Sequence, residues 1–130
     1  AIIVVRFQGP KANGMPELHG LTPILAVLQD RGLKVALITD GRMSGASGKV
    51  PAAIHLSPEA ANLGPISKIK NGDLIRLDAR SGELNILDEN FEIRESRKKD
   101  LSENERGLGR ELFNIFGVNA TAAKFGGGIT

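Results

Sequence analysis

Two short apolar runs on either side of a helix-sized segment constrain the fold of this chain more than any other feature. Residues 2–7 and 34–39 are continuous and rich in β-branched side chains, as strands buried on both faces are. Between them, apolar residues repeat at the spacing of one helix face: Leu21, Ile24, Leu25 and Leu28. A strand, a helix and a second strand in close succession predict a parallel crossover, as in α/β folds.

The ends of the predicted helix follow from its capping residues. Thr22 has the side chain of an N-cap, and Pro23 suits the first helical position. Gly32 suits the position just beyond the last turn, where a left-handed backbone conformation is common. The preceding segment, residues 8–20, holds three glycines and two prolines and is predicted to be a loop.

Three more elements are predicted around the middle and at the end of the chain. Residues 52–56 predict a short strand, and residues 57–61 predict a helix start with Ser57 as its cap. Ser102 and Glu105 have the spacing of a capping box. The helix that follows is expected to present one apolar face: Leu108, Leu112, Ile115 and Phe116.

A β-hairpin is predicted between these elements. Residues 73–87 alternate apolar and polar side chains on both sides of Ser81 and Gly82. Phe91 and Ile93 are expected to continue this β region. Parallel and hairpin signals together predict a mixed α/β fold, and 130 residues without a repeat or a dividing linker predict a single domain, residues 1–130.

The composition excludes several classes of protein. The chain has no cysteine, so it can supply no disulfide, thiolate nucleophile or cysteine ligand of an iron–sulfur cluster. Its only aromatic residues are five phenylalanines and its net charge is +2, which argues against nucleic-acid binding. The apolar run at residues 1–5 is too short to span a bilayer and lacks the basic region of a signal peptide. A beginning inside a predicted strand is typical of a piece of a longer chain.

The polar, glycine-rich loop at residues 40–49 is the main candidate for a functional site. Ligands of open α/β sheets bind beyond the carboxyl ends of the strands, and both long loops follow predicted parallel strands. The loops 8–20 and 40–49 are therefore expected to meet. They would bring these side chains within reach of one ligand: Glu17, Asp40, Arg42, Ser44, Ser47 and Lys49.

Three interpretations of this loop remain open on the residues alone. Backbone N–H groups between glycines can cradle a phosphate, although Val50 after Lys49 breaks the pattern of a Walker A loop. Ser44 beside a glycine could project a reactive hydroxyl, but the spacing places neither His19 nor His55 next to it as a base. The loop could also be only a tight connection between strands.

The carboxylates of the two loops also have two interpretations each. Glu17 is either a solvated side chain or a ligand of a hard cation such as Mg²⁺, if other oxygens converge on it. Asp40 is either a second oxygen at such a site or a cap of the turn that follows it.

Two long motifs resemble those of a known enzyme family. The segments RFQGPKANGMPELHGLTP at 6–23 and VALITDGRMSGASGKVPAAIHLSPEA at 35–60 resemble the dihydroxy-acid dehydratase and 6-phosphogluconate dehydratase family, as do the later GDLIRLD, SGELNIL and GRELF. The resemblance covers nearly the whole chain and corresponds to the carboxyl-terminal domain of that family. It implies a swivelling β/α domain with a barrel-like mixed sheet and a few flanking helices, cut from a longer dehydratase.

Within the family, the chain is more similar to the 6-phosphogluconate branch. It has Gln8, Asn13 and His19 where the branched-chain amino-acid branch typically has Glu, a Pro-type residue and Met, and it has Met43 in place of Phe. The resemblance implies a lyase that removes water from 6-phospho-D-gluconate to give 2-dehydro-3-deoxy-6-phosphogluconate in the Entner–Doudoroff pathway. Another sugar-acid or dihydroxy-acid dehydratase of the same family is the nearest alternative.

The resemblance also implies roles, cofactors and partners. The serine of TDGRxSG, here Ser44, is the base that takes the C2 proton, and the glutamate of GMPE, here Glu17, is a Mg²⁺ ligand. An iron–sulfur cluster is expected in the larger amino-terminal domain of the same protein, which this sequence lacks. A cytoplasmic homodimer is expected for the full-length protein, with a phosphorylated sugar acid as its substrate.

Charge and position assign four further roles. Arg42, Lys49 and Ser47 are predicted to bind the carboxylate or phosphate of the substrate, and Asp40 is predicted to orient the loop. The isolated domain is expected to be inactive, because the cluster and most metal ligands lie elsewhere. A rival of a different class is a stand-alone swivelling domain that binds an anionic metabolite without catalysis.

Overall fold

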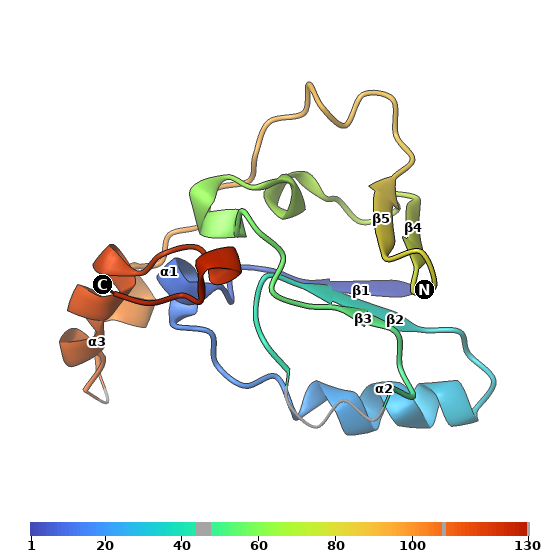
Figure 1. The fold of residues 1–130 in the computed structure, drawn as a ribbon, viewed down its shortest axis with the longest axis horizontal. Coiled ribbons are helices and arrows are strands. Elements are labelled where there is room, and N and C mark those ends of the chain that lie inside the picture. Colours follow the sequence, from blue (N-terminus) through green and yellow to red (C-terminus); the bar gives the residue numbers. More distant parts are fainter. Residues whose placement is uncertain (44–47, 108, 130) are drawn as a thin grey trace.

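A three-stranded parallel sheet lies at the centre of the computed structural model, which describes residues 1–43, 48–107 and 109–129, except for the side chain of Leu112. The strands are β1 (Ile2–Val5), β2 (Ala36–Thr39) and β3 (Ala52–Ala53), with β2 in the middle (Figure 1). Both β1 and β3 pair with β2 in parallel. The predicted parallel crossover is therefore confirmed, with strands that are shorter than the apolar runs.

Helix α2 (Leu21–Asp30) makes the crossover from β1 to β2. The prediction of Thr22 as its N-cap is wrong, because the N–H of Thr22 already donates to the carbonyl of His19 at 3.1 Å within the first turn. The Thr22 hydroxyl instead donates to the sulfur of Met43 at 3.0 Å. The prediction for Gly32 is confirmed, since it follows the helix with a φ of +84°.

The sheet has an apolar cluster on each face, as the period of two along a strand requires. Leu37 and Ile38 of β2 are fully buried and belong to different clusters. Leu37 joins the cluster with Leu25 of α2, whereas Ile38 joins the cluster with Phe7 and Ile66. Helix α2 therefore covers one face, and the segment after β3 covers the other (Figure 1).

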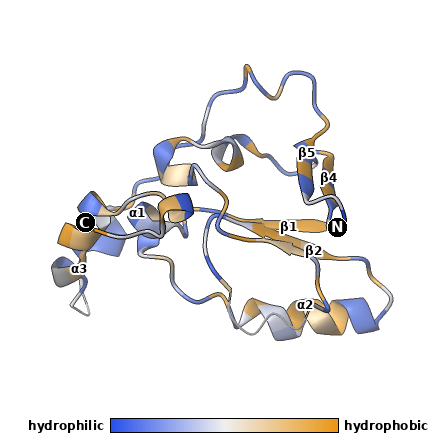
Figure 2. Cartoon of the chain, viewed as in Figure 1, coloured by the Kyte–Doolittle hydropathy of each residue, from blue (hydrophilic) through white to orange (hydrophobic). Residues whose placement is uncertain are grey.

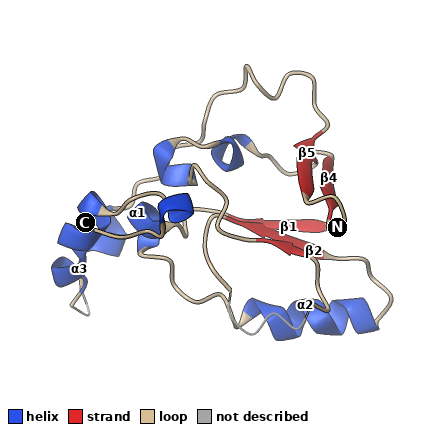
Figure 3. Cartoon of the chain, in the orientation of Figure 1, coloured by secondary structure: helices blue, strands red, loops and turns tan. Residues whose placement is uncertain are grey.

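Part of that other cover is a β-hairpin, as predicted. Strands β4 (Ile75–Asp78) and β5 (Glu83–Ile86) pair antiparallel in a separate two-stranded sheet (Figure 3). The expectation that Phe91 and Ile93 continue this sheet is wrong. The N–H of Phe91 donates to the carbonyl of Asp88 at 3.0 Å, which closes a turn. Phe91 is buried in the core, and Ile93 is 83% exposed.

The segment between β3 and the hairpin contains two short 3₁₀ helices, η1 (Ala60–Asn62) and η2 (Pro65–Lys68). The prediction that Ser57 caps a helix here is wrong. The helix begins only at Ala60, after an extended residue, and the buried Ser57 hydroxyl has no hydrogen-bond partner in the part of the chain that is described. The peptide bond between Ser57 and Pro58 is cis.

The carboxyl-terminal part of the chain also contains short helices. The 3₁₀ helix η3 (Ser102–Glu105) precedes α3 (Arg110–Asn119), which packs against the single turn α1 (Pro10–Asn13), and η4 (Ala123–Phe125) follows. The capping-box prediction is wrong: η3 has no side-chain cap, and α3 begins after Gly109, whose φ is +78°.

Helix α3 exposes apolar side chains instead of burying them. Ile115 and Phe116, predicted to lie on a buried face, are 66% and 41% exposed, and Phe113 and Val118 are exposed as well. Leu108 and the side chain of Leu112 lie outside the described part of the chain. Figure 2 shows these apolar stretches of α3 at the periphery, away from the central sheet. The helix is confirmed, but the two described residues of its predicted apolar face, Ile115 and Phe116, remain exposed.

The mixed α/β class is confirmed, whereas a barrel is not. In residues 1–43, 48–107 and 109–129, the parallel sheet and the hairpin stay separate, and neither closes on itself. No helix in these ranges has the length and apolarity that a membrane span needs.

Candidate functional site

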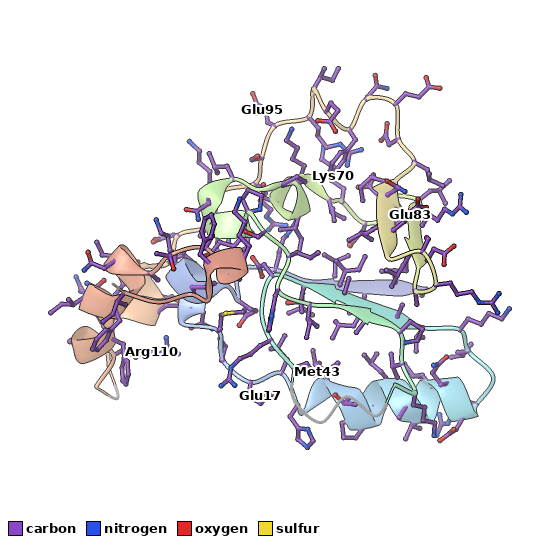
Figure 4. The ribbon with its side chains drawn as sticks, viewed as in Figure 1. Glu17, Met43, Lys70, Glu83, Glu95 and Arg110 are labelled. Carbon is purple, nitrogen blue, oxygen red and sulfur yellow. The ribbon has the colours of Figure 1, made fainter. Side chains whose placement is uncertain are left out.

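The two loops that follow β1 and β2 meet at the carboxyl end of the sheet, as the sequence predicts. Glu17 and Arg42 form an isolated parallel bridge, with the N–H of Leu18 donating to the carbonyl of Arg42 at 3.2 Å. The Arg42 guanidinium donates from Nε to the carbonyl of Met15 at 2.6 Å, and its Nη1 lies 3.6 Å from Oε2 of Glu17. Figure 4 shows Glu17 on the segment between α1 and α2.

Both side chains of the Glu17–Arg42 pair are partly exposed. The side chain of Arg42 is 52% exposed and that of Glu17 is 30% exposed. Exposed ion pairs of this kind stabilise a fold by at most about 1 kcal/mol. The pair therefore contributes little to stability, and its main effect is to place two charges. A carboxylate and a guanidinium lie side by side on the two loops that carry the sequence motifs.

Asp40 is fully buried and holds the start of the first loop to the second. Its carboxylate accepts three backbone hydrogen bonds, from the N–H groups of Phe7 at 3.2 Å, Gln8 at 3.0 Å and Ala60 at 2.8 Å. A buried carboxylate is tolerated only with such donors. This arrangement is compatible with an orienting role for Asp40, which stays a prediction.

The backbone that Asp40 holds is strained. Phe7 has a φ of +61°, a region that is unfavourable for a residue with a side chain. Next to it, burial and nearby Arg97 lower the pKa of Arg6, while Asp40 acts in the opposite direction. The Arg6 guanidinium donates to three carbonyl oxygens of the η2 segment: those of Ile66, Ser67 and Ile69.

Glu59 is a second buried carboxylate, and sequence reasoning missed it. It accepts hydrogen bonds from the N–H groups of Lys11 at 2.9 Å and Ala12 at 3.0 Å, so it fixes α1. Gly9 lets it approach, since a Cβ there would lie 2.4 Å from Oε2 of Glu59. The sequence offers no signal for this contact, because a glutamate after Pro58 is ordinary at a helix start.

Helix α3 joins the same loop through a chain of side-chain hydrogen bonds. Nη1 of Arg110 donates to Oδ1 of Asn13 at 2.9 Å and to the carbonyl of Asn104 at 3.1 Å. The amide of Asn13 donates to Oε1 of Gln8 at 2.9 Å, and that of Asn104 donates to the carbonyl of Ala12 at 3.1 Å. Periodicity and spacing carry no information on contacts between residues so far apart in sequence.

Lys49 is not brought to the Glu17–Arg42 pair. It precedes β3 and therefore lies toward the amino ends of the strands, whereas Arg42 follows β2 at their carboxyl ends. Its ammonium is 2.7 Å from a carboxylate oxygen of Asp30, the last residue of α2. The binding of a substrate anion by Lys49 stays a prediction.

The two predicted serines, Ser44 and Ser47, lie outside the described residues, so their roles also stay predictions. Within the described ranges, no three His, Cys, Asp or Glu side chains gather to hold a metal ion. A carboxylate oxygen is chemically suited to Mg²⁺, and the role of Glu17 as a ligand of this ion stays a prediction.

Comparison with known proteins agrees with the motifs. A family model described as Dihydroxy-acid/6-phosphogluconate dehydratase C-terminal matches residues 1–127. The chain is 59% identical over 130 residues to a phosphogluconate dehydratase of Rhizobium meliloti, covering 98% of the chain and 22% of that relative. It is 58% identical to one of Helicobacter pylori strain J99, covering 97% and 22%, and 53% identical to one of Escherichia coli K12, covering 96% and 21%.

The chain thus spans about a fifth of the length of these relatives. Such a relative therefore has nearly four fifths of its residues outside the matched segment.

Proposed function

The chain belongs to the dihydroxy-acid/6-phosphogluconate dehydratase family as its C-terminal domain, and we propose that it completes the active site of a hydro-lyase acting on 6-phospho-D-gluconate. One observation carries the proposal: the two loops with the family motifs are joined through Glu17 and Arg42 at the carboxyl end of the sheet. The names of the relatives support the choice of substrate within the family. A place in the Entner–Doudoroff pathway follows from the proposed substrate and product.

In the proposed reaction, Ser44 takes the proton from C2 of the substrate, and the electron pair left behind forms the C2–C3 double bond. The C3–O bond breaks, and the hydroxyl leaves with a proton as water. The resulting enol loses the proton of its C2 hydroxyl and gains one at C3, which gives the 2-keto product, so one substrate gives one product and one water. A serine hydroxyl is a weak base in water, and nearby positive charge favours its deprotonated form.

The described residues supply charge and position for this chemistry. Arg42, two residues before Ser44, offers a guanidinium suited to bind a carboxylate or phosphate oxygen of the substrate. Glu17 would supply one carboxylate oxygen to Mg²⁺, an ion that stabilises negative charge developing on a substrate carboxylate. Asp40 and Glu59 hold the backbone of both loops, so that these side chains stay in register.

The partner in this proposal is the amino-terminal domain of the full-length protein. The chain has no cysteine, so cysteine ligands of an iron–sulfur cluster would come from that domain. The exposed apolar side chains of α3, among them Phe113 and Phe116, lie beside a cavity of about 680 Å³ that also borders α1, and this surface suits the docking of another domain. A homodimer and a cytoplasmic location remain predictions.

A substrate comparison on the full-length protein tests the proposal. The protein, reconstituted with iron, sulfide and Mg²⁺, is offered 6-phosphogluconate, unphosphorylated gluconate and a branched dihydroxy acid, and the 2-keto product is measured. We expect turnover of 6-phosphogluconate with a higher kcat/KM than for the other two. A preference for the dihydroxy acid would assign the protein to the other branch of the family. No turnover of any of them would favour a binding domain without catalysis.

A further inference from the structure

We propose that Gln8 donates a hydrogen bond to a negatively charged oxygen of the substrate, and that Arg110 on α3 fixes the direction of the Gln8 amide. The inference rests on the proposed function, and it adds a binding residue and a positioning residue to the same site. It starts from the hydrogen-bond chain that runs from Arg110 through Asn13 to Gln8.

The Arg110 guanidinium at one end determines which atom donates and which accepts in each hydrogen bond of this series. Arginine has only donors, so the atom of Asn13 that faces Nη1 of Arg110 must be the oxygen. The other half of the Asn13 amide is then the donor, and the atom of Gln8 that it meets must be an oxygen as well. The remaining half of the Gln8 amide is therefore an NH₂ group, which donates to no other described residue.

Gln8 lies where the two motif loops come together. Its backbone N–H is bound by Asp40 at 3.0 Å, and a Cβ added to Gly41 would lie 2.8 Å from the Cβ of Gln8. Gly41 directly precedes Arg42, and Asn13 comes four residues before Glu17. Figure 4 shows Arg110 on α3 and Glu17 on the segment between α1 and α2.

The chemistry of the free amide group indicates what it binds. A Gln8 amide group that can only donate, on a side chain that packs against Gly41 just before Arg42, suits a carboxylate or phosphate oxygen of a sugar acid. Glutamate at position 8 would still accept from Asn13, but it would present a carboxylate to the anion in place of a donor. The Gln8→Glu substitution therefore keeps the internal bond and reverses only the outward group.

The test compares steady-state kinetics of variants of the full-length protein on 6-phosphogluconate. For Gln8→Glu, we expect a KM at least about tenfold higher than wild type, in line with losing a hydrogen bond to a charged group, and a smaller change in kcat. Arg110→Met allows the Asn13 amide to rotate and should also raise KM. Arg110→Lys keeps a side chain that donates and cannot accept, so its KM should stay close to that of wild type. Arg106→Met, on an exposed arginine four residues earlier, is the matched control and should behave as wild type.

The possible outcomes distinguish a failure of this inference from a failure of the proposed function. Wild-type turnover with a KM for Gln8→Glu within about threefold of wild type overturns this inference and leaves the proposed function standing. If KM rises equally in Arg110→Met and Arg110→Lys, the positioning role is overturned. The rise would then come from structural damage and not from the loss of a hydrogen-bond donor. A wild-type protein with no turnover overturns the proposed function and this inference with it.

Discussion

Oε2 of Glu17 lies 3.6 Å from Nη1 of Arg42, and the same two residues form a backbone bridge between the loops after β1 and β2. The ion pair is exposed, so the backbone bridge and the hydrogen bond from Arg42 to the carbonyl of Met15 hold the loops together more than the charges do. Positions on one motif loop are thereby tied to positions on the other.

Replacement of Glu17 by Gln should weaken the dependence of the full-length enzyme on Mg²⁺. The amide is uncharged and a poorer ligand for a hard cation, so we expect half-maximal activity to need at least about tenfold more Mg²⁺. Glu83→Gln, an exposed position on the hairpin, is the matched control. An unchanged Mg²⁺ titration in Glu17→Gln would exclude Glu17 as a ligand.

Truncation of Glu59 should destabilise the domain. Glu59→Ala leaves the buried N–H groups of Lys11 and Ala12 without their acceptor, at a cost of about 1–3 kcal/mol each. Glu59→Gln retains one carbonyl oxygen and should lose less. Urea unfolding followed by far-UV circular dichroism is the measurement, since the chain has no Trp or Tyr. Glu95→Ala, at an exposed position, should have no effect, and an equal effect there would refute the prediction.

A methyl group at Gly64 should also destabilise the fold, for steric reasons alone. Its Cβ would lie 1.8 Å from the carbonyl oxygen of Pro58, and the φ of −60° is otherwise acceptable for alanine. We expect Gly64→Ala to lower the free energy of unfolding by about 1–3 kcal/mol or more. Gly128→Ala, where an added Cβ meets nothing within 4 Å, is the control. Equal stability of the two variants would contradict the packing described here.

The pairing of Asp73 with Arg94 predicts a specific pH dependence of stability. The hydrogen bond from Arg94, at 2.6 Å, lowers the pKa of Asp73, and Arg94 also contacts Asp88. A carboxyl group with a lowered pKa stabilises the fold above its unfolded pKa of about 3.9, and this contribution disappears as the pH falls through the folded value. Asp73→Asn should therefore be less stable than wild type at pH 7.

The same pair predicts how this difference changes with acid. Unfolding of wild type and Asp73→Asn is compared at pH 7, 5 and 3, and the gap between them should narrow only below about pH 4. Glu89→Gln, an exposed carboxylate nearby in sequence, should show no such gap. A gap that is constant down to pH 3 would assign the effect of Asp73→Asn to packing and not to ionisation.

The sequence predicted those parts of the fold that depend on local periodicity. The parallel crossover, the hairpin around Ser81 and the left-handed Gly32 all follow from apolar spacing and turn chemistry. The three predicted N-caps were wrong. Thr22, Ser57 and Ser102 have side chains typical of N-caps, but α2 begins before Thr22, η1 begins three residues after Ser57, and η3 begins at Ser102 itself.

The candidate site was predicted in outline from topology. Parallel strands bring their following loops to one edge, and this places Glu17 beside Arg42. The same rule did not predict the position of Lys49. The loop of residues 40–49 is long enough to return the chain to the amino ends of the strands, where Lys49 pairs with Asp30. Glu59 and Arg110 were missed because their partners, Lys11 and Asn13, are distant in sequence and no periodic pattern encodes such contacts.

The most direct test is the rate of 6-phosphogluconate dehydration by the full-length protein with Ser44→Ala, beside wild type and Ser81→Ala. Ser81 lies in the turn of the hairpin, so its substitution controls for loss of a hydroxyl outside the two motif loops. If Ser44 is the base, Ser44→Ala should lower kcat by about 10²–10⁴-fold, while Ser81→Ala stays at the wild-type rate. A Ser44→Ala protein with near-wild-type kcat would contradict the proposal that this domain supplies the base of the reaction.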